Sequence, residues 1–251
     1  MPKLKLARHW WVIGIGLSLL FLLRFLPPDT SLARLRQKGS INVCYPPNLK
    51  PLISYQRVGD KVEGIETSII QSLAQSLDLR INWNLQRDWY RSIDPSAWGI
   101  RKGACDILVG GIVDSKASKG FFILSPAHLQ SGWAMVGEMP QRRDEVGFWA
   151  PYFGLDVARF TATSYLDKAR LNPYFLSDPD EALSMLKSRE LKAVLTDSLT
   201  AAWLAEMTGL ASWQIAELPS FGFSLATWKG NVTLRRAMLK SAKSYRPETQ
   251  P

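Results

Sequence analysis

The segment DILVGGIVDSKASKGFFILSPAH, Asp106–His128, gives the clearest indication of the fold. An apolar run ends at the paired Gly110 and Gly111, a short polar turn follows, and a second apolar run ends at Ser-Pro. Paired glycines directly after a strand are typical of a place where another group approaches the backbone closely. The segment therefore predicts a strand whose carboxyl end faces a binding crevice.

Strands and helices alternate on both sides of this segment. The predicted elements before it are a short helix at 33–39, a strand at 41–45, a hairpin turning at Gly59-Asp60, a helix at 66–77, a strand at 79–85 and a helical region at 88–103. Those after it are a strand at 154–160, helices at 163–169 and 177–188, a strand at 191–197, a helix at 198–209, a strand at 221–230 and a helix at 231–245. This alternation predicts an α/β protein with parallel sheets, in two lobes joined by extended crossovers.

The charge of the chain is positive but scattered. The net charge is +9 over 251 residues, and beyond residue 35 there are 26 Lys and Arg against 21 Asp and Glu. No basic run and no nucleic-acid-binding motif is present, which argues against a nucleic-acid partner. The composition, with 46% hydrophobic and 21% charged residues, is that of a globular protein.

The N-terminus has the pattern of a targeting segment. Lys3, Lys5 and Arg8 precede the apolar run WVIGIGLSLLFLL, Trp11–Leu23. A helix over residues 10–26 would be about 25 Å long, close to the hydrocarbon core of about 30 Å. Since no clear cleavage site follows, we expect an uncleaved signal anchor (residues 1–27, then a linker at 28–35) rather than a removed signal peptide. Positive charges before the run predict that the rest of the chain lies in the periplasm.

The two cysteines are expected to be free. Cys44 lies near the end of one predicted strand, and Cys105 directly precedes another. If these strands are parallel neighbours, the two thiols lie about three residues, or roughly 10 Å, apart along the sheet. A disulfide requires Cα atoms within about 7 Å of each other. We therefore predict two buried thiols.

Signatures of enzymes and metal sites are missing. The chain has no GxxxxGK[ST], GxSxG, HExxH or Cys-x-x-Cys motif, and His128 is the only histidine beyond the N-terminal segment. One histidine and two distant cysteines do not make a typical metal site. The sequence therefore predicts a non-catalytic protein without a cofactor or metal.

The order of these pieces resembles the family 3 extracellular solute-binding proteins, the polar-amino-acid receptors of ABC transporters. The matching pieces are KGSINVCY, YQRVGDKVEGIETSIIQSLAQSLDLRI, GACDILVGGI, FILSPAH, LKAVLTDSLTAAWLA and FGFSLATWKGNVTLRRAMLKSA, between residues 36 and 245. The resemblance implies a bilobed type II periplasmic-binding-protein fold, with lobe one at residues 36–130 and 219–251 and lobe two at 131–218. It also implies that the lobes close on a small solute about two hinge strands.

The resemblance assigns a carboxylate-binding turn to lobe one. Gly110, Gly111 and Ile112 would present backbone groups to the α-carboxylate of an amino acid. Val113 and Ser118 stand where the family has a Thr and an Arg, so the forked cation is missing. A charge-assisted hydrogen bond contributes about 1.5–3 kcal/mol, and its loss puts ordinary amino-acid recognition in doubt. Two readings of Lys116 and Lys119 stay open, one as replacements for that charge and the other as solvated side chains.

The resemblance assigns the other contacts to lobe two and to an aromatic lining. Asp197 would accept the ligand's ammonium group, or cap the helix that follows it, or do both. Thr161, Thr163 and Ser164 match a loop at a helix start. Two aromatic residues, Tyr45 and Trp89, are candidates for the lining. Glu66 matches an acidic position and is read first as a partner of the helix dipole.

Three functions remain open on the sequence. The first is a non-catalytic solute receptor for uptake or sensing, with an ABC transporter permease or another membrane protein as its partner. The second is a membrane-tethered accessory protein of the same fold that acts through a protein partner. The third is a dehydratase-like enzyme, for which Glu66, Asp197 and His128 are the candidate acids and bases.

Overall fold

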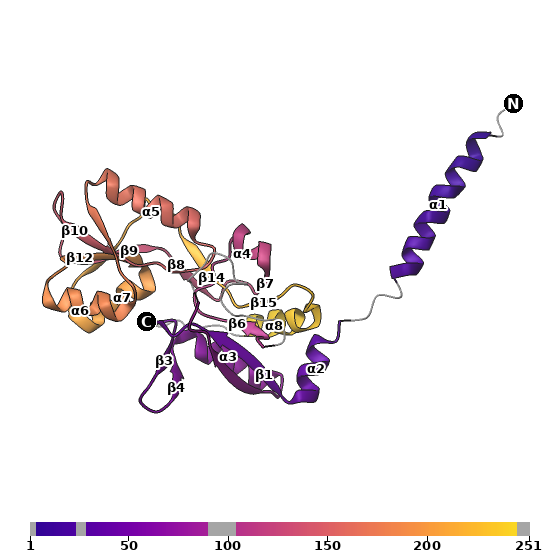
Figure 1. Ribbon diagram of the computed structural model, residues 1–251, viewed down its shortest axis with the longest axis horizontal. Coiled ribbons are helices and arrows are strands. Elements are labelled where there is room, and N and C mark those ends of the chain that lie inside the picture. Colours follow the sequence, from indigo (N-terminus) through magenta and orange to yellow (C-terminus); the bar gives the residue numbers. More distant parts are fainter. Residues whose placement is uncertain (1–3, 24–28, 90–103, 245–251) are drawn as a thin grey trace. The chain divides into compact units, whose positions relative to one another are not determined.

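The computed structural model describes residues 4–23, 29–89 and 104–244. They belong to two units, Met1–Thr30 and Ser31–Pro251, each of which is described by itself. The first unit contains helix α1 (Leu4–Leu23), at the predicted targeting segment (Figure 1). Within the described ranges, no helix combines the length and apolarity that a membrane crossing requires. The anchor itself stays a prediction, and the helical region predicted at 88–103 lies largely outside the described residues.

The first of two five-stranded sheets has the order β5-β1-β6-β15-β7 (Figure 1). Its strands are β1 (Ser40–Tyr45), β5 (Arg80–Leu85), β6 (Ile107–Leu108), β7 (Phe122–Leu124) and β15 (Ala226–Trp228). Strand β1 is parallel to β5 and β6, whereas β15 is antiparallel to β6 and β7. Helices α2 (Ser31–Lys38) and α3 (Ile65–Ser76) both contact the last helix, α8 (Val232–Ser244). The helix predicted from the apolar spacing after Gly64 is thus confirmed.

A smaller sheet follows β1 and holds the predicted hairpin. It consists of β2 (Asn48–Leu49), β3 (Ile53–Gln56) and β4 (Lys61–Glu63) in the order β2-β3-β4. The hairpin turns at Gly59 and Asp60, as predicted. Both residues have positive φ, which is typical of tight hairpin turns.

The second large sheet has the order β11-β10-β12-β9-β13. Its strands are β9 (Trp133–Gly137), β10 (Glu145–Phe148), β11 (Asn172–Phe175), β12 (Ala193–Asp197) and β13 (Ser212–Gln214). Strand β10 is parallel to β11 and β12, and β9 is antiparallel to β12 and β13. Helices α5 (Asp156–Lys168), α6 (Pro179–Ser188) and α7 (Ser198–Thr208) pack around this sheet (Figure 1). The predicted start of α6 is confirmed, since Asp178 accepts hydrogen bonds from the Asp180 and Glu181 amides.

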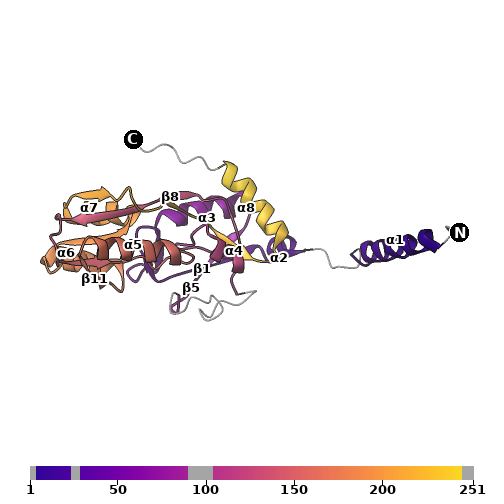
Figure 2. The ribbon, with the colours of Figure 1, turned by 90° about the horizontal axis from the view of Figure 1, so that it is seen from above.

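Two short strands carry the chain between the large sheets. Strands β8 (Leu129–Ser131) and β14 (Phe221–Phe223) pair antiparallel with each other in a two-stranded sheet of their own (Figure 1). In Figure 2, β8 lies between α7 and α3. Strand β8 leads from β7 to β9, and β14 leads from β13 to β15. This arrangement agrees with the predicted hinge strands, while the residue boundaries of the two lobes stay a prediction.

The prediction of a strand at 154–160 is wrong, because α5 begins at Asp156. Leu155, Ala162 and Leu166 are buried and recur at helical spacing, whereas Val157 and Phe160 are exposed. The strand of the second sheet lies earlier, at Glu145–Phe148. The single strand predicted at 221–230 is likewise two strands, β14 and β15.

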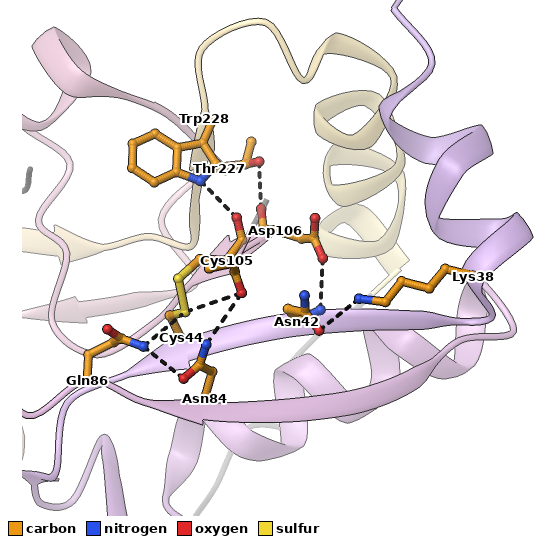
Figure 3. The surroundings of a disulfide bond; sticks show 10 residues. Lys38, Asn42, Cys44, Asn84, Gln86, Cys105, Asp106, Thr227 and Trp228 are labelled. Carbon is orange, nitrogen blue, oxygen red and sulfur yellow. Dashed lines mark hydrogen bonds between the residues drawn. A yellow bond between two sulfur atoms is a disulfide. The ribbon is translucent and has the colours of Figure 1, made fainter. Parts of the chain in front are cut away.

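The prediction of free thiols is also wrong, because Cys44 and Cys105 form a disulfide with their Cα atoms 5.5 Å apart (Figure 3). The assumed parallel register is present, since Cys44 pairs with Leu108. The error was to extend the strand back through Cys105, whereas the chain bends at Asp106 and β6 begins only at Ile107. The bend brings the two cysteines together.

Side-chain hydrogen bonds hold this bend in place (Figure 3). The Asp106 carboxylate accepts from the Asn42 amide at 2.9 Å, and the Thr227 hydroxyl donates to the Asp106 carbonyl at 2.8 Å. The Trp228 indole donates to the Cys105 carbonyl at 2.8 Å. Strand β15 is thereby tied to the disulfide.

Candidate functional site

The Gly110-Gly111 turn follows β6 and has left-handed backbone conformations, with φ of 100° and 68°. The Gly110 amide donates to Glu66 Oε2 at 2.6 Å, and Glu66 Oε1 lies 3.0 Å from His128 Nε2. Glu66 is fully buried, and 4% of the His128 side chain is exposed. A carboxylate at the start of α3 therefore fixes the turn from behind and connects it to the residue before β8.

The ring of Tyr152 covers the other side of the turn. A Cβ atom at Gly111 would lie 2.4 Å from Tyr152 Cδ1, so only glycine leaves room for the ring. Tyr152 is 1% exposed and packs edge-on against Phe223 of β14, with 4.9 Å between the ring centroids. Since Tyr152 follows β10 of the second sheet and Gly111 follows β6 of the first, the contact between the ring and the turn joins the two large sheets.

The hydroxyl of Tyr152 reaches the candidate ammonium-binding residue. It donates a hydrogen bond to Asp197 Oδ2 and lies 3.2 Å from the Thr200 hydroxyl oxygen. The other oxygen of Asp197 accepts from the Leu199 and Thr200 amides at the start of α7 and from the Ser131 hydroxyl. Asp197 is completely buried, and its predicted helix-capping role is confirmed.

The backbone of Phe153 pairs with the glycine turn. The Val113 amide donates to the Phe153 carbonyl at 3.0 Å, and the Phe153 amide donates to the Gly111 carbonyl at 3.1 Å. Ile112 lies opposite Phe153 as in a short parallel bridge and is fully buried. The segment at 152–153 therefore lies along the whole turn that was predicted to hold a carboxylate.

Ser118 takes part in this contact, whereas the two lysines are exposed. Ser118 is buried in the first turn of α4 (Lys116–Phe121), and its hydroxyl lies within 3.4 Å of the Phe153 carbonyl. Lys116 is exposed, and Lys119 is exposed and forms an ion pair with Asp114. This arrangement favours the solvated reading of both lysines.

Thr161 and Thr163 do not lie in a loop at a helix start, so that placement is wrong. Both lie inside α5, where their hydroxyls donate to carbonyls of the preceding turn. Ser164 lies in the same helix. The helix begins instead at Asp156, just after Tyr152 and Phe153. Its start therefore lies seven residues, or about two helical turns, before the helix start predicted at residue 163.

Tyr45 and Trp89 are both buried, at 3% and 4% exposure. Tyr45 makes an edge-on contact with Trp83, and burial, followed by the charges of Tyr55 and Asp60, raises the pKa of its hydroxyl to about 12. Trp89 belongs to a small apolar cluster with Cys44, Cys105 and Phe153. In this structure both aromatic residues are therefore packing residues.

Tyr152 and Phe153 were missed by the sequence reasoning. Their only signal was the run WAPYFG, Trp149–Gly154, in which aromatic residues surround a proline immediately before the predicted second-lobe strand. In the part of the chain that the structure describes, no group of three or more His, Cys, Asp or Glu side chains could hold a metal ion. The candidate site thus consists of the Gly110-Gly111 turn, the Asp197 carboxylate and the side chain of Tyr152, which contacts both.

Comparison with known proteins identifies the fold. No protein-family model and no curated protein sequence matches the chain. An ancestral amino-acid-binding protein described as a precursor of cyclohexadienyl dehydratase is 16% identical, with a TM-score of 0.69 over 85% of this chain and 92% of that one. A substrate-binding protein of an ABC uptake transporter from Streptococcus pneumoniae, with bound histidine, is 17% identical, with a TM-score of 0.68 over 86% and 90%. An ancestral arginine-binding protein bound to arginine is 17% identical, with a TM-score of 0.65 over 82% and 92%. The chain thus has the bilobed type II periplasmic-binding-protein fold, as the sequence predicted, and resembles in structure the amino-acid-binding proteins of ABC transporters.

Proposed function

We propose that this protein is a non-catalytic, extracytoplasmic protein of the solute-binding fold that carries its own side chain in the amino-acid site and acts through a protein partner. The observation that carries this proposal is the buried Tyr152, which contacts both Gly111 and Asp197. Of the three functions open on the sequence, this is the accessory role. The receptor role requires Tyr152 to leave the site.

The segment at 152–153 contacts the groups to which the resemblance assigns the ammonium group and the carboxylate of a free amino acid. In the resemblance, Asp197 accepts the ligand's ammonium group, and here it accepts the Tyr152 hydroxyl. In the resemblance the backbone of the turn binds the ligand's carboxylate, and here the Gly110 amide donates to Glu66 and the Gly111 carbonyl accepts from the Phe153 amide. Asp197, the Gly110 amide and the Gly111 carbonyl are therefore already engaged within the chain.

Displacing this segment has an energetic cost that a ligand would have to offset. Burial of a large side chain stabilises the folded protein by about 1.5–3 kcal/mol, and the hydrogen bond to Asp197 adds about 1.5 kcal/mol or more. A penalty of about 3 kcal/mol weakens binding by roughly a hundredfold. A micromolar receptor would become a receptor of about 0.1 mM.

The enzymatic alternative lacks an accessible acid or base among its candidates. Glu66 and Asp197 are fully buried, and the His128 side chain is 4% exposed. Each is engaged with neighbouring groups of the chain. A substrate would have to break these contacts before any proton transfer, so we propose a role without catalysis.

A thermal-shift screen of the purified chain with amino acids tests the alternative that the protein is a receptor whose site is open to a free ligand. A ligand at 100 times its Kd stabilises a protein by about 2.7 kcal/mol, or about 5–10 °C in Tm for a chain of this size. At about 0.1 mM amino acid an unblocked micromolar site would give that shift, whereas the weakened Kd of about 0.1 mM gives only about 0.4 kcal/mol, or about 1–2 °C. We expect no amino acid to exceed this smaller shift. A saturable shift of about 5–10 °C at about 0.1 mM that disappears in Asp197→Asn would establish a receptor and overturn the proposal.

The partner is tested in cells that make the protein. Chemical cross-linking should give one discrete adduct above the 28.2 kDa of the chain, reproducibly and at native expression level. Exclusive recovery of the uncross-linked chain under conditions that trap a known complex of the same compartment would contradict an accessory role.

A further inference from the structure

A cavity that does not include Tyr152 lies between the β3–β4 hairpin, the segment at 47–50, the end of β5 and the first turn of α6. Its volume is about 600 Å³, within the range of small-molecule sites. Its polar lining consists of Asn48, Lys50, Tyr55, Gln56, Arg57, Arg87 and Asp180. Most of this lining comes from the first large sheet and the β2-β3-β4 sheet beside it, whereas Asp180 comes from α6, which packs on the second large sheet.

The acidic residue of this cavity is already compensated. Lys50 Nζ lies 2.8 Å from Asp180 Oδ1, and Asn48 Nδ2 donates to Asp180 Oδ2 at 2.9 Å. Asp180 also lies in the first turn of α6, where the helix dipole stabilises a carboxylate. The charges of Lys50 and Asp180 cancel, so the net charge of the residues that line the cavity comes from Arg57 and Arg87.

Arg57 and Arg87 line this cavity without a salt-bridge partner in the described ranges. Both also act on the hydroxyl of Tyr55. The pKa of that hydroxyl is raised, chiefly by its hydrogen bond to Asp60, and the charges of the two arginines oppose the rise. Two guanidinium groups and the Asp60 carboxylate thus lie near one phenol, which leaves an excess of one positive charge there.

A neutral acceptor lies in the same cavity. Asn48 Oδ1 is buried and has no hydrogen-bond donor in the part of the chain that the structure describes. A buried acceptor without a donor costs about 1–3 kcal/mol. An N–H group of a ligand would remove this cost, while the apolar side chains of Val58 and Leu85 contribute the rest of the lining.

We propose that this cavity binds a carboxylate that carries an amide N–H nearby. Arg57 and Arg87 would hold the carboxylate by charge-assisted hydrogen bonds, for which the planar guanidinium is suited. Asn48 Oδ1 would accept from the N–H. Two sources share this chemistry, a free N-acylated acidic amino acid and an Asp or Glu residue within a partner's peptide. The site goes beyond the proposed function, because it does not involve Tyr152 or Asp197.

Calorimetric titration of the full chain tests the proposal with three probes. N-acetyl-aspartate represents the free acid, acetyl-triglutamyl-amide represents an acidic peptide, and N-acetyl-asparaginamide, whose two carboxyl groups are both amides, is the uncharged control ligand. We expect one of the two acidic probes to bind and N-acetyl-asparaginamide not to bind. The stronger acidic probe identifies the source.

Three variants localise the binding. Arg57→Gln and Arg87→Gln should each weaken the bound acidic probe about tenfold or more, since a charge-assisted hydrogen bond contributes about 1.5–3 kcal/mol. Arg142→Gln, an equal charge change at an exposed turn outside the cavity, should leave the affinity within about twofold. The three arginines are exposed, so folding is expected to persist.

Two results would overturn the proposal. One is the absence of binding of both acidic probes at millimolar concentration, and the other is equal weakening in Arg142→Gln and the two cavity variants. The thermal-shift screen with amino acids should give the same result in Arg57→Gln and Arg87→Gln as in the wild type, because neither arginine contacts Tyr152 or Asp197 in the described ranges. Failure at this cavity is thereby distinguished from failure of the proposed function, which depends on Tyr152.

Discussion

The Tyr152 hydroxyl donates a hydrogen bond to the Asp197 carboxylate, and both residues are buried. Tyr152 follows a strand of the second sheet, and its ring lies against Gly111, which follows a strand of the first. One side chain therefore connects the turn and the carboxylate that the resemblance assigns to opposite ends of a ligand. The proposed role of the protein depends on this connection.

Removing the hydroxyl should destabilise the fold without removing the ring. Tyr152→Phe deletes a hydrogen bond to a buried carboxylate, and we expect a loss of about 2 kcal/mol in the free energy of unfolding. Tyr165→Phe is the matched control, since the Tyr165 hydroxyl has no hydrogen-bond partner within the described ranges. Urea denaturation measures both. Equal losses in the two variants would mean that the contact with Asp197 contributes nothing.

Removing the disulfide should lower stability by a larger amount. The two cysteines are separated by 61 positions, for which loop closure predicts about 4 kcal/mol. For a chain of this size this corresponds to a decrease of about 8–16 °C in Tm. The double variant Cys44→Ala, Cys105→Ala should show that decrease and become insensitive to reductant. A reductant-sensitive Tm in the double variant would assign the effect to another cause.

Tyr45 should titrate at unusually high pH. Burial raises the pKa of its hydroxyl to about 12 from about 10 in the unfolded chain. Between these values the unfolded chain loses the proton and the folded one keeps it, so the contribution of Tyr45 to stability is lost as pH rises from about 10 to about 12. An ultraviolet titration should resolve this component in the wild type and lose it in Tyr45→Phe. Its persistence in that variant would reject the assignment.

The regular elements could be predicted because local rules decide them. The apolar spacing of α3, the Asp-Pro start of α6 and the Asp197 cap of α7 each depend on residues close in sequence. The order of these elements also led to the bilobed fold. Fold class was therefore within reach of the sequence alone.

The errors at the disulfide and at Tyr152 concern contacts between distant segments, whereas the error at 154–160 concerns which residues of one segment are buried. The disulfide depends on a bend at Asp106, which strand geometry does not contain. The apolar residues at 154–160 also fit a strand, and only the burial of Leu155, Ala162 and Leu166 distinguishes the helix. In the sequence Tyr152 cannot be distinguished from other aromatic residues of the core, and only the structure shows the hydrogen bond from its hydroxyl to Asp197. Helices and strands follow local periodicity, whereas the content of the crevice follows from tertiary packing.

A double-mutant cycle between Gly111 and Tyr152 tests most directly whether the phenol fills the crevice. Gly111→Ala places a methyl group at 2.4 Å from the ring and at a φ of 68°, so we expect a loss of about 2–4 kcal/mol in the wild-type background. In a Tyr152→Ala background the backbone strain and a 2.9 Å approach to Leu49 Cδ2 remain, and the loss should fall to about 1–2 kcal/mol. We therefore expect a coupling energy of at least about 1 kcal/mol. An identical cost of Gly111→Ala in both backgrounds would show that Tyr152 does not lie against the turn, and would contradict the account.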